Sequence, residues 1–303
     1  LIKGAAEFYR NFPNVRKGRD GKLHIHHVNN HEADWNQSDT IEEITAMHGI
    51  LPVAIRAAEI LGLDAELRLL WRDFLATLTP IPTKRNAKGK VGYTAMNPVV
   101  FFDLVTLESE DHKKLELAQN AFFPKGVPPG EGETQFHHNG IAAARLGRAD
   151  ALKTLVPNQM LRDSRGVIMR NRLSLCEGFQ AISAQRFGRS SEAMQLALCQ
   201  SVPPVPGGNP VIRIFAAWPV EWDADFSLLC RGGFQVASSV KKGRIGPVHI
   251  ESRGGGTCRL RNPWGEDSSI TLTSSRAKPK TLHGSLLSFK TRVGETLTIS
   301  KSS

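Results

Sequence analysis

The hydrophobic pattern of this 303-residue chain changes near Pro203. Before that point, apolar side chains recur every three or four positions, the spacing of helices that bury one face. After it, short apolar runs are separated by Gly, Pro, Asn or Asp, which is typical of strands joined by turns. The sequence therefore predicts a fold that is mainly α and then β, with helical hairpins over residues 1–205 and a small β-sandwich over residues 206–303.

A pair of helices is the clearest element of the first part. Apolar residues spaced at steps of three or four predict a helix from Ile41 to Gly62, kinked or split at Pro52, and a second helix follows from Asp64 to Pro80. Thr40 and Glu43 have the spacing of a capping box at the first helix start. Residues 134–147 and 149–161 predict another hairpin, residues 178–199 predict the last helix, and residues 83–95 form a polar loop or small hairpin.

Composition argues against several classes of function. The net charge of +10 comes from scattered Lys and Arg without a basic block, which favours a solvated basic surface over a nucleic-acid site. The sequence contains no run of about 18 apolar residues, so we expect no membrane span. The four cysteines form no CxxC pair, so we expect buried free thiols, and they do not indicate a redox compartment.

A polar run precedes the helix at Ile41 and carries most of the candidate functional side chains. Its histidines (His24, His26, His27 and His31) raise the alternative of a metal site. A zinc site needs three or four ligands at fixed spacing, and no HExxH or CxxC motif accompanies these histidines. We therefore expect no metal and no other cofactor.

Several phrases of the chain resemble a known family. FAAWP at Phe215–Pro219, RGGFQV at Arg231–Val236 and CRLRNPW at Cys258–Trp264 are similar to phrases at the end of glycoside hydrolase family 95 proteins, the α-L-fucosidase A-like group. Upstream, AIRAAEILGLDAELRLLWRDFLATLTPIPT and NGIAAARLGRADAL resemble helical phrases of the same family, in the same order.

The resemblance implies the second half of an (α/α)6 toroid followed by a C-terminal β-domain. A complete toroid needs about a dozen helices, roughly twice what this chain shows, so we expect Leu1 to lie inside a longer protein and the chain alone to be inactive. The sequence shows no leader at Leu1, but a leader could have been removed, so the N-terminus does not indicate where the protein is located. The resemblance suggests a secreted or periplasmic protein of a bacterium.

The resemblance also implies a chemistry, the inverting hydrolysis of a terminal α-L-fucosyl bond, or that of a similar L-sugar, in oligosaccharides or polysaccharides. Inversion needs an acid for the leaving oxygen and a base for water. Glu32 matches the acid of the family's SPEN phrase, although Asn30 and His31 replace Ser-Pro, and Glu42 and Glu43 are rival acids. Glu177 lies where the family has the base, the Asp of a QIDGN phrase.

Each candidate also has a structural alternative. Glu42 and Glu43 can simply stabilise a helix N-terminus through its dipole, and Glu177 can be a polar residue at a helix start. Trp35 can stack on a sugar or fill the core. The remaining candidates for binding sugar hydroxyls, with loop packing as their alternative, are His27, Asn29, Asn30 and His138.

Two functions remain open from the sequence. One is an inverting exo-glycosidase, and the other is a non-catalytic carbohydrate-binding or structural relative. The second is motivated by the altered SPEN phrase and by Glu177, whose side chain is one methylene longer than the family's Asp. The oligomeric state is not readable from the sequence.

Overall fold

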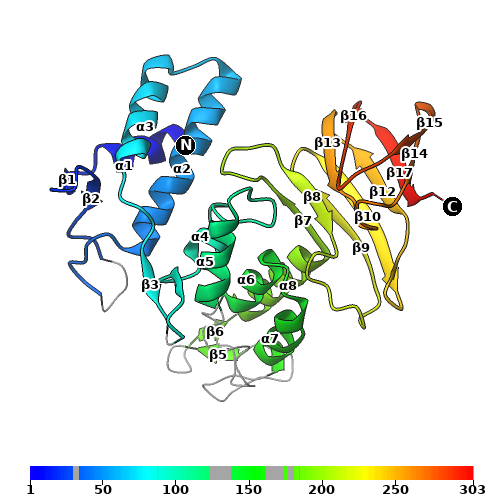
Figure 1. The fold of residues 1–303 in the computed structure, drawn as a ribbon, viewed down its shortest axis with the longest axis horizontal. Coiled ribbons are helices and arrows are strands. Elements are labelled where there is room, and N and C mark those ends of the chain that lie inside the picture. Colours follow the sequence, from blue (N-terminus) through cyan, green and yellow to red (C-terminus); the bar gives the residue numbers. More distant parts are fainter. Residues whose placement is uncertain are drawn as a thin grey trace. The chain divides into compact units, whose positions relative to one another are not determined.

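The computed structural model describes residues 1–29, 34–86, 88–122, 138–161, 174–176, 181–183 and 185–302. Contacts group the chain into two compact units, Leu1–Gly126 with Pro203–Asn209, and Val127–Val202 with Pro210–Ser303. Helices predominate before residue 199 and strands after it, so the predicted class, mainly α and then β, is confirmed (Figure 1). The toroid, and its predicted boundary with the sandwich, stay predictions.

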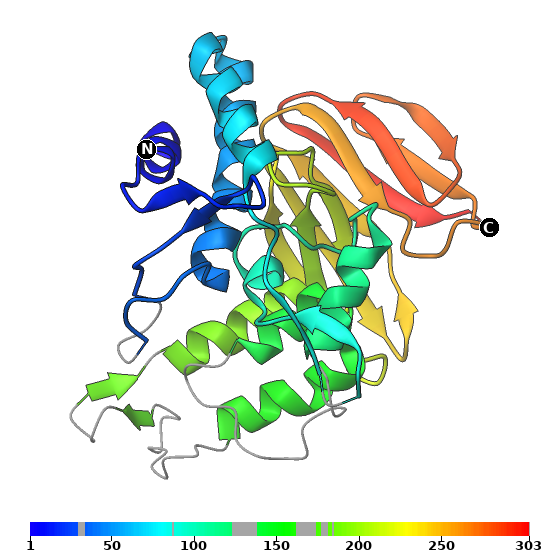
Figure 2. The same ribbon diagram turned by 60° about the vertical axis from the view of Figure 1, so that its left-hand side comes forward.

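Three helices build the core of the first unit: α1 (Ile2–Arg10), α2 (Ile41–Leu61) and α3 (Ala65–Thr77). α2 and α3 run side by side as the predicted hairpin (Figures 1 and 2). The buried side chains of α2 recur with helical spacing, so one apolar stripe faces the core. The largest of them are Ile44, Met47 and Leu51.

A polar contact fastens α1 to α3. The Glu7 carboxylate accepts hydrogen bonds from the Trp71 indole nitrogen, 2.6 Å away, and from the Arg10 guanidinium, 2.6 and 2.8 Å away. Arg10 and Trp71 both favour the ionised carboxylate, and together they hold the pKa of Glu7 down at about 2. Trp71 itself is only 1% exposed, so its indole N–H needs this partner.

The predicted end of α2 agrees with the structure, whereas its predicted N-terminal cap does not. Gly62 ends the helix in the left-handed conformation, at φ 66°, and α2 continues through Pro52 as one helix. The expected capping box is wrong, because the Thr40 side chain makes no capping hydrogen bond. Glu43 is hydrogen-bonded to Tyr9 of α1 instead, and this contact competes with capping.

The remaining elements of the first unit are short. β1 (Val15–Lys17) pairs with β2 (Leu23–Ile25), and β3 (Thr83–Arg85) pairs with β4 (Val91–Tyr93), which confirms the hairpin alternative for residues 83–95. Two helices follow, α4 (Asn97–Val100) and α5 (His112–Phe122).

The helices of the second unit pack through small residues. α6 (Asn139–Arg145) and α7 (Ala149–Leu161) form the predicted hairpin, and both pack against α8 (Gln185–Leu198). Ala142 of α6 and Ala193 of α8 are fully buried. The predicted helix over residues 178–199 begins too early, because residues 181–183 form a strand, β6, paired with β5 (Ser174–Cys176).

Two sheets form the predicted sandwich. The smaller contains β7 (Cys199–Val202), β8 (Val211–Ile214), β13 (Gly256–Arg261) and β16 (Leu286–Thr291). The larger contains β9 (Ala224–Cys230), β10 (Phe234–Lys241), β11 (Arg244–Ile245), β12 (Val248–Ser252), β14 (Ile270–Ser274), β15 (Ala277–Leu282) and β17 (Glu295–Lys301). Burial alternates along β10 and β12, as expected for strands with one face in a core.

The sandwich core also contains three free thiols, Cys199, Cys230 and Cys258, all buried as predicted. The sulfur atoms of Cys199 and Cys230 lie 3.3 Å apart. Burial raises the pKa of the Cys258 thiol to about 12, so this group stays protonated and acts as a small apolar filler.

One described helix, α2, is long and apolar enough to cross a membrane by length and composition alone, and half of its apolar window is buried inside the unit. Burial of this kind is also found in core helices of soluble units. Among the described residues, no group of three or more His, Cys, Asp and Glu side chains is arranged to hold a metal ion.

We predict that Leu260→Ala destabilises the second unit by about 2–5 kcal/mol, because Leu260 is fully buried and the substitution leaves a cavity. Leu229→Ala is the matched control, since Leu229 is 64% exposed. Its effect should stay within about 0.5 kcal/mol. Urea unfolding monitored by circular dichroism measures both changes, and equal effects would contradict the assigned core.

Candidate functional site

Residues 26–40, called the polar loop below, connect β2 to α2 and carry most of the predicted binding residues. Ile25, the last residue of β2, and Val28, near the start of the loop, are buried in the unit core. Across the loop, the backbones of Val28 and Gln37 exchange two hydrogen bonds of 3.1 and 2.8 Å, and the Asp39 N–H donates to the Ile25 carbonyl at 2.9 Å. The base of the loop is therefore fixed on the core.

The Asp39 carboxylate braces the loop at the start of α2. One oxygen accepts the backbone N–H of Ile25 at 3.0 Å, and the other lies 2.6 Å from Nδ1 of His24. The second ring nitrogen of His24 lies 3.1 Å from Asp20. The carboxylates of Asp39 and then Asp20 favour the imidazolium, so they raise the pKa of His24 above its usual range.

Three non-glycine residues of the polar loop adopt left-handed backbone conformations: His27 at φ 55°, Asn36 at φ 59° and Asp39 at φ 49°. Each costs about 1–3 kcal/mol, and such strain concentrates at functional sites. Side-chain hydrogen bonds support these conformations. Nδ1 of His27 lies 2.5 Å from the amide oxygen of Asn36, whose own N–H donates to the Asn29 side chain at 3.2 Å.

Trp35 lies outside the core. It is 64% exposed, which excludes the alternative that it fills the core. A large aromatic side chain held at the surface by a braced loop is a platform on which a ring-shaped ligand can stack.

The two predicted acids at the start of α2 have different surroundings. Glu42 accepts a long hydrogen bond of 3.5 Å from the Asn97 amide, and its other oxygen is buried with no hydrogen-bond partner in the described structure. A buried carboxylate oxygen without a hydrogen-bond partner among the described residues is unusual. Burial, together with the negative charge and hydrogen bond of Glu43, raises the pKa of Tyr9.

Five of the predicted residues lie in the polar loop or in the first turn of α2: His27, Asn29, Trp35, Glu42 and Glu43. Three others, Glu32, Asn30 and Glu177, lie outside the described residues. His138 belongs to the second unit, where it directly precedes α6 and its carbonyl accepts the N–H of Ala142 at 2.9 Å.

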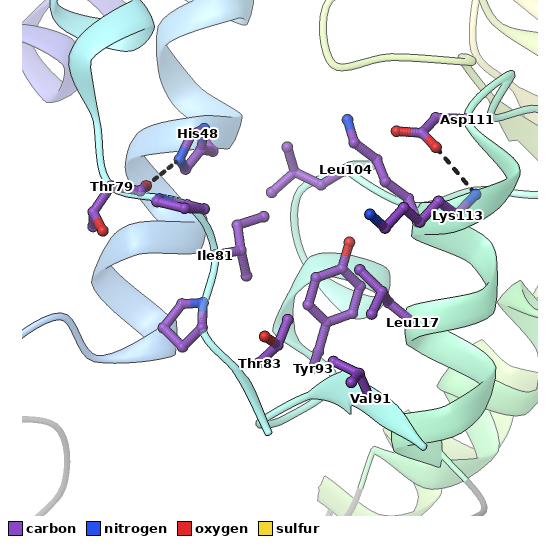
Figure 3. Close-up of a pocket in the computed structure, with 13 residues that line it drawn as sticks. His48, Thr79, Ile81, Thr83, Val91, Tyr93, Leu104, Asp111, Lys113 and Leu117 are labelled. Carbon is purple, nitrogen blue, oxygen red and sulfur yellow. Dashed lines mark hydrogen bonds between the residues drawn. The ribbon is translucent and has the colours of Figure 1, made fainter. Parts of the chain in front are cut away.

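The sequence did not indicate two features of this unit. The first is the contact between His24 and Asp39, which joins residues 15 positions apart. The only related signal in the sequence was the position of Asp39 close to a predicted helix start. The other is a cavity of about 640 Å³, which contains none of the predicted site residues (Figure 3). It is lined by His48, Thr79, Pro80, Ile81, Pro82, Thr83, Val91, Tyr93, Leu104, Asp111, Lys113, Lys114 and Leu117.

The sequence and the structure were compared with known families, curated proteins and solved structures. No family model matches the sequence, and no curated protein matches it. The chain is similar to the crystal structure of an α-L-rhamnosidase from Streptomyces avermitilis in complex with L-rhamnose, with a TM-score of 0.44 and 13% identity. The match covers 86% of this chain and 27% of that one. This chain therefore spans less than a third of the length of that protein.

We predict that Asp39→Asn lowers the pKa of His24 towards its usual value of about 6.5. Asparagine tolerates the left-handed conformation and keeps an acceptor oxygen, so the substitution removes mainly the charge. Because the folded pKa is raised, the stabilisation from His24 is fully present below about pH 6.5 and is lost as the pH rises through the folded value.

NMR titration of the histidine ring signals measures this pKa, and urea unfolding between about pH 6 and pH 9 measures the linked loss of stability. Asp20→Asn serves as the comparison and should lower the pKa less, because Asp39 makes the larger contribution. A pKa of His24 that is the same with and without the Asp39 carboxylate would contradict the brace.

Proposed function

We propose that this chain is part of a glycoside hydrolase that removes a terminal α-L-fucosyl, or similar L-sugar, residue from an oligosaccharide or polysaccharide with inversion. The sequence phrases that resemble glycoside hydrolase family 95 support the class of enzyme. The structural observation that carries the proposal is Trp35, exposed on a strained and braced loop directly before α2.

The chemistry of a sugar fits this loop. A pyranose presents an apolar face of C–H groups and a rim of hydroxyls that both donate and accept hydrogen bonds. Trp35 offers a flat apolar surface, and the side chains of His27 and Asn29 offer polar groups beside it. The hydrogen bonds among His27, Asn29 and Asn36 hold these groups in place before a ligand arrives, which lowers the entropic cost of binding.

The proposed reaction uses two carboxyl groups. An acid donates its proton to the glycosidic oxygen as the bond to the anomeric carbon breaks, and a carboxylate base takes a proton from the water that attacks the opposite face. Glu32, Glu42 and Glu43 are the candidate acids, and Glu177 is the candidate base. Between the two glutamates of α2, Glu42 is favoured, because Glu43 is already hydrogen-bonded to Tyr9.

A non-catalytic carbohydrate-binding relative is the second candidate. It is favoured by Glu177, whose longer side chain would place the attacking water differently from an aspartate at that position. A displacement of about 1 Å can cost on the order of a hundredfold in rate. Calorimetric binding of a fucosyl-oligosaccharide without any hydrolysis product after long incubation would favour this candidate.

We predict that replacing the true acid by Gln lowers kcat/KM about 10²–10⁴-fold on a natural fucosyl-oligosaccharide, and much less on 4-nitrophenyl α-L-fucoside. Nitrophenolate leaves without protonation, whereas a sugar alkoxide does not. Because the chain alone is expected to be inactive, Glu32→Gln, Glu42→Gln and Glu43→Gln are assayed in the full-length gene product.

Two further variants control this experiment. Glu66→Gln changes an exposed glutamate of α3 and should leave both substrates unaffected. Glu177→Gln should lower turnover of both substrates alike, since activation of water is needed for either. Full activity of all three acid variants on the natural substrate would exclude every acid named here.

We also predict that Trp35→Ala raises KM severalfold and changes kcat little, because a stacking contact stabilises the bound sugar in the ground state and the transition state alike. Trp35→Phe should restore part of the binding. Steady-state kinetics on the same oligosaccharide measure both, and an unchanged KM would show that Trp35 lies away from the substrate.

A further inference from the structure

The cavity of about 640 Å³ in the first unit has an apolar interior and a charged rim. Its volume lies in the range of small-molecule sites. Ile81, Leu104 and Leu117 supply apolar walls, and Leu104 is only 8% exposed. Of the Asp and Lys residues in the lining, Asp111 and Lys113 are exposed at the start of α5 (Figure 3), and Lys114 is half-buried. A ligand would therefore bury an apolar body and keep a charged group at the rim.

Tyr93 is the polar group of the interior. It is 4% exposed, and Figure 3 shows its hydroxyl turned towards the space between Ile81, Leu104 and Lys113. No hydrogen bond to this hydroxyl occurs within the described residues. Burial, and secondarily the charge of Asp111, raises the pKa of Tyr93 to about 12, so the hydroxyl keeps its proton and can donate it in a hydrogen bond.

The position of Tyr93 is fixed by its neighbours. The preceding residue, Gly92, lies so close to α5 that a Cβ there would approach the backbone nitrogen of Ala121 to 2.7 Å. The Asn120 side chain also donates to the Val91 carbonyl at 2.9 Å. β4 is therefore clamped onto α5, and the Tyr93 hydroxyl is held in the cavity before any ligand binds.

The charges around the cavity favour an anion. Lys113 and Lys114 are positive, and Asp111 is the single acidic residue among the described lining residues. Nε2 of His48 lies 2.9 Å from the Thr79 carbonyl, to which it donates. Burial, and to a smaller extent the charge of Lys114, lowers the pKa of His48, so the ring is neutral near pH 7. The net charge of the lining is thus positive.

We propose that this cavity binds a small carboxylate with an apolar body, whose anionic group is held by the Tyr93 hydroxyl and the ammonium group of Lys113 or Lys114. The proposal does not depend on glycoside hydrolysis. The apolar walls disfavour a polar acid such as a uronate, because its buried hydroxyls would lack enough partners.

Titration calorimetry with cinnamate, its neutral analogue cinnamamide, and glucuronate tests the proposal on the full 303-residue chain. Cinnamate should bind, and at least tenfold more tightly than either of the other two. Equal binding of the acid and the amide would overturn the anionic requirement, tighter binding of glucuronate would overturn the apolar one, and no binding of any probe would overturn the site.

Two variants locate the binding. Tyr93→Phe should weaken cinnamate binding about tenfold while leaving the melting temperature unchanged, because the hydroxyl has no hydrogen-bond partner to lose among the described residues. Lys114→Met should weaken it severalfold, whereas Lys84→Met, a matched change on the exposed strand β3, should not. Unchanged cinnamate affinity in both Tyr93→Phe and Lys114→Met would overturn the assignment.

Discussion

Burial of one face of α2 is the constraint on which the first unit depends. Ile44, Met47 and Leu51 are fully buried, and α1, α3 and the start of the polar loop pack on the same core. Burial of side chains of this size contributes about 1.5–3 kcal/mol each. That stabilisation offsets the three left-handed residues of the loop, at about 1–3 kcal/mol each. The loop keeps a strained shape because the helix beside it is strongly fixed.

Asp39 links this constraint to the candidate site. Asp39 lies two residues before the first residue of α2. Its carboxylate contacts both the backbone N–H of Ile25 and the ring of His24. The side chains proposed to meet a sugar therefore lie on a segment fixed at both ends. Trp35 can stay exposed because the loop draws its stability from Ile25 and Val28 and from its hydrogen bonds.

The helices and strands with a clear apolar period were predictable from the sequence. α2 and α3 follow from spacings of three and four, and β10 and β12 from alternation. β15 was not predictable, because all of its residues except the last, Leu282, are exposed and the strand has no alternating pattern. The capping box was a local motif that a tertiary contact overrode, since Glu43 hydrogen-bonds to Tyr9.

The candidate site was predictable only as a list of residue types. The sequence placed Trp35 and the histidines before a helix, but it could not show that Trp35 stays exposed, because an aromatic residue is compatible with either environment. The cavity around Tyr93 could not be predicted from the sequence for a different reason. Its residues come from α2, the segment between α3 and β3, the β3–β4 hairpin, the segment between α4 and α5, and α5 itself, and no sequence period joins them.

The central proposal is that this chain belongs to an inverting enzyme acting on an α-L-sugar. Proton NMR during the first minutes of hydrolysis identifies the anomer that is released before mutarotation mixes the two forms. With an α-L-fucosyl substrate and the full-length gene product, the account predicts that the β anomer is formed first. Initial release of the α anomer would show retention and would contradict the proposed acid-and-base pair.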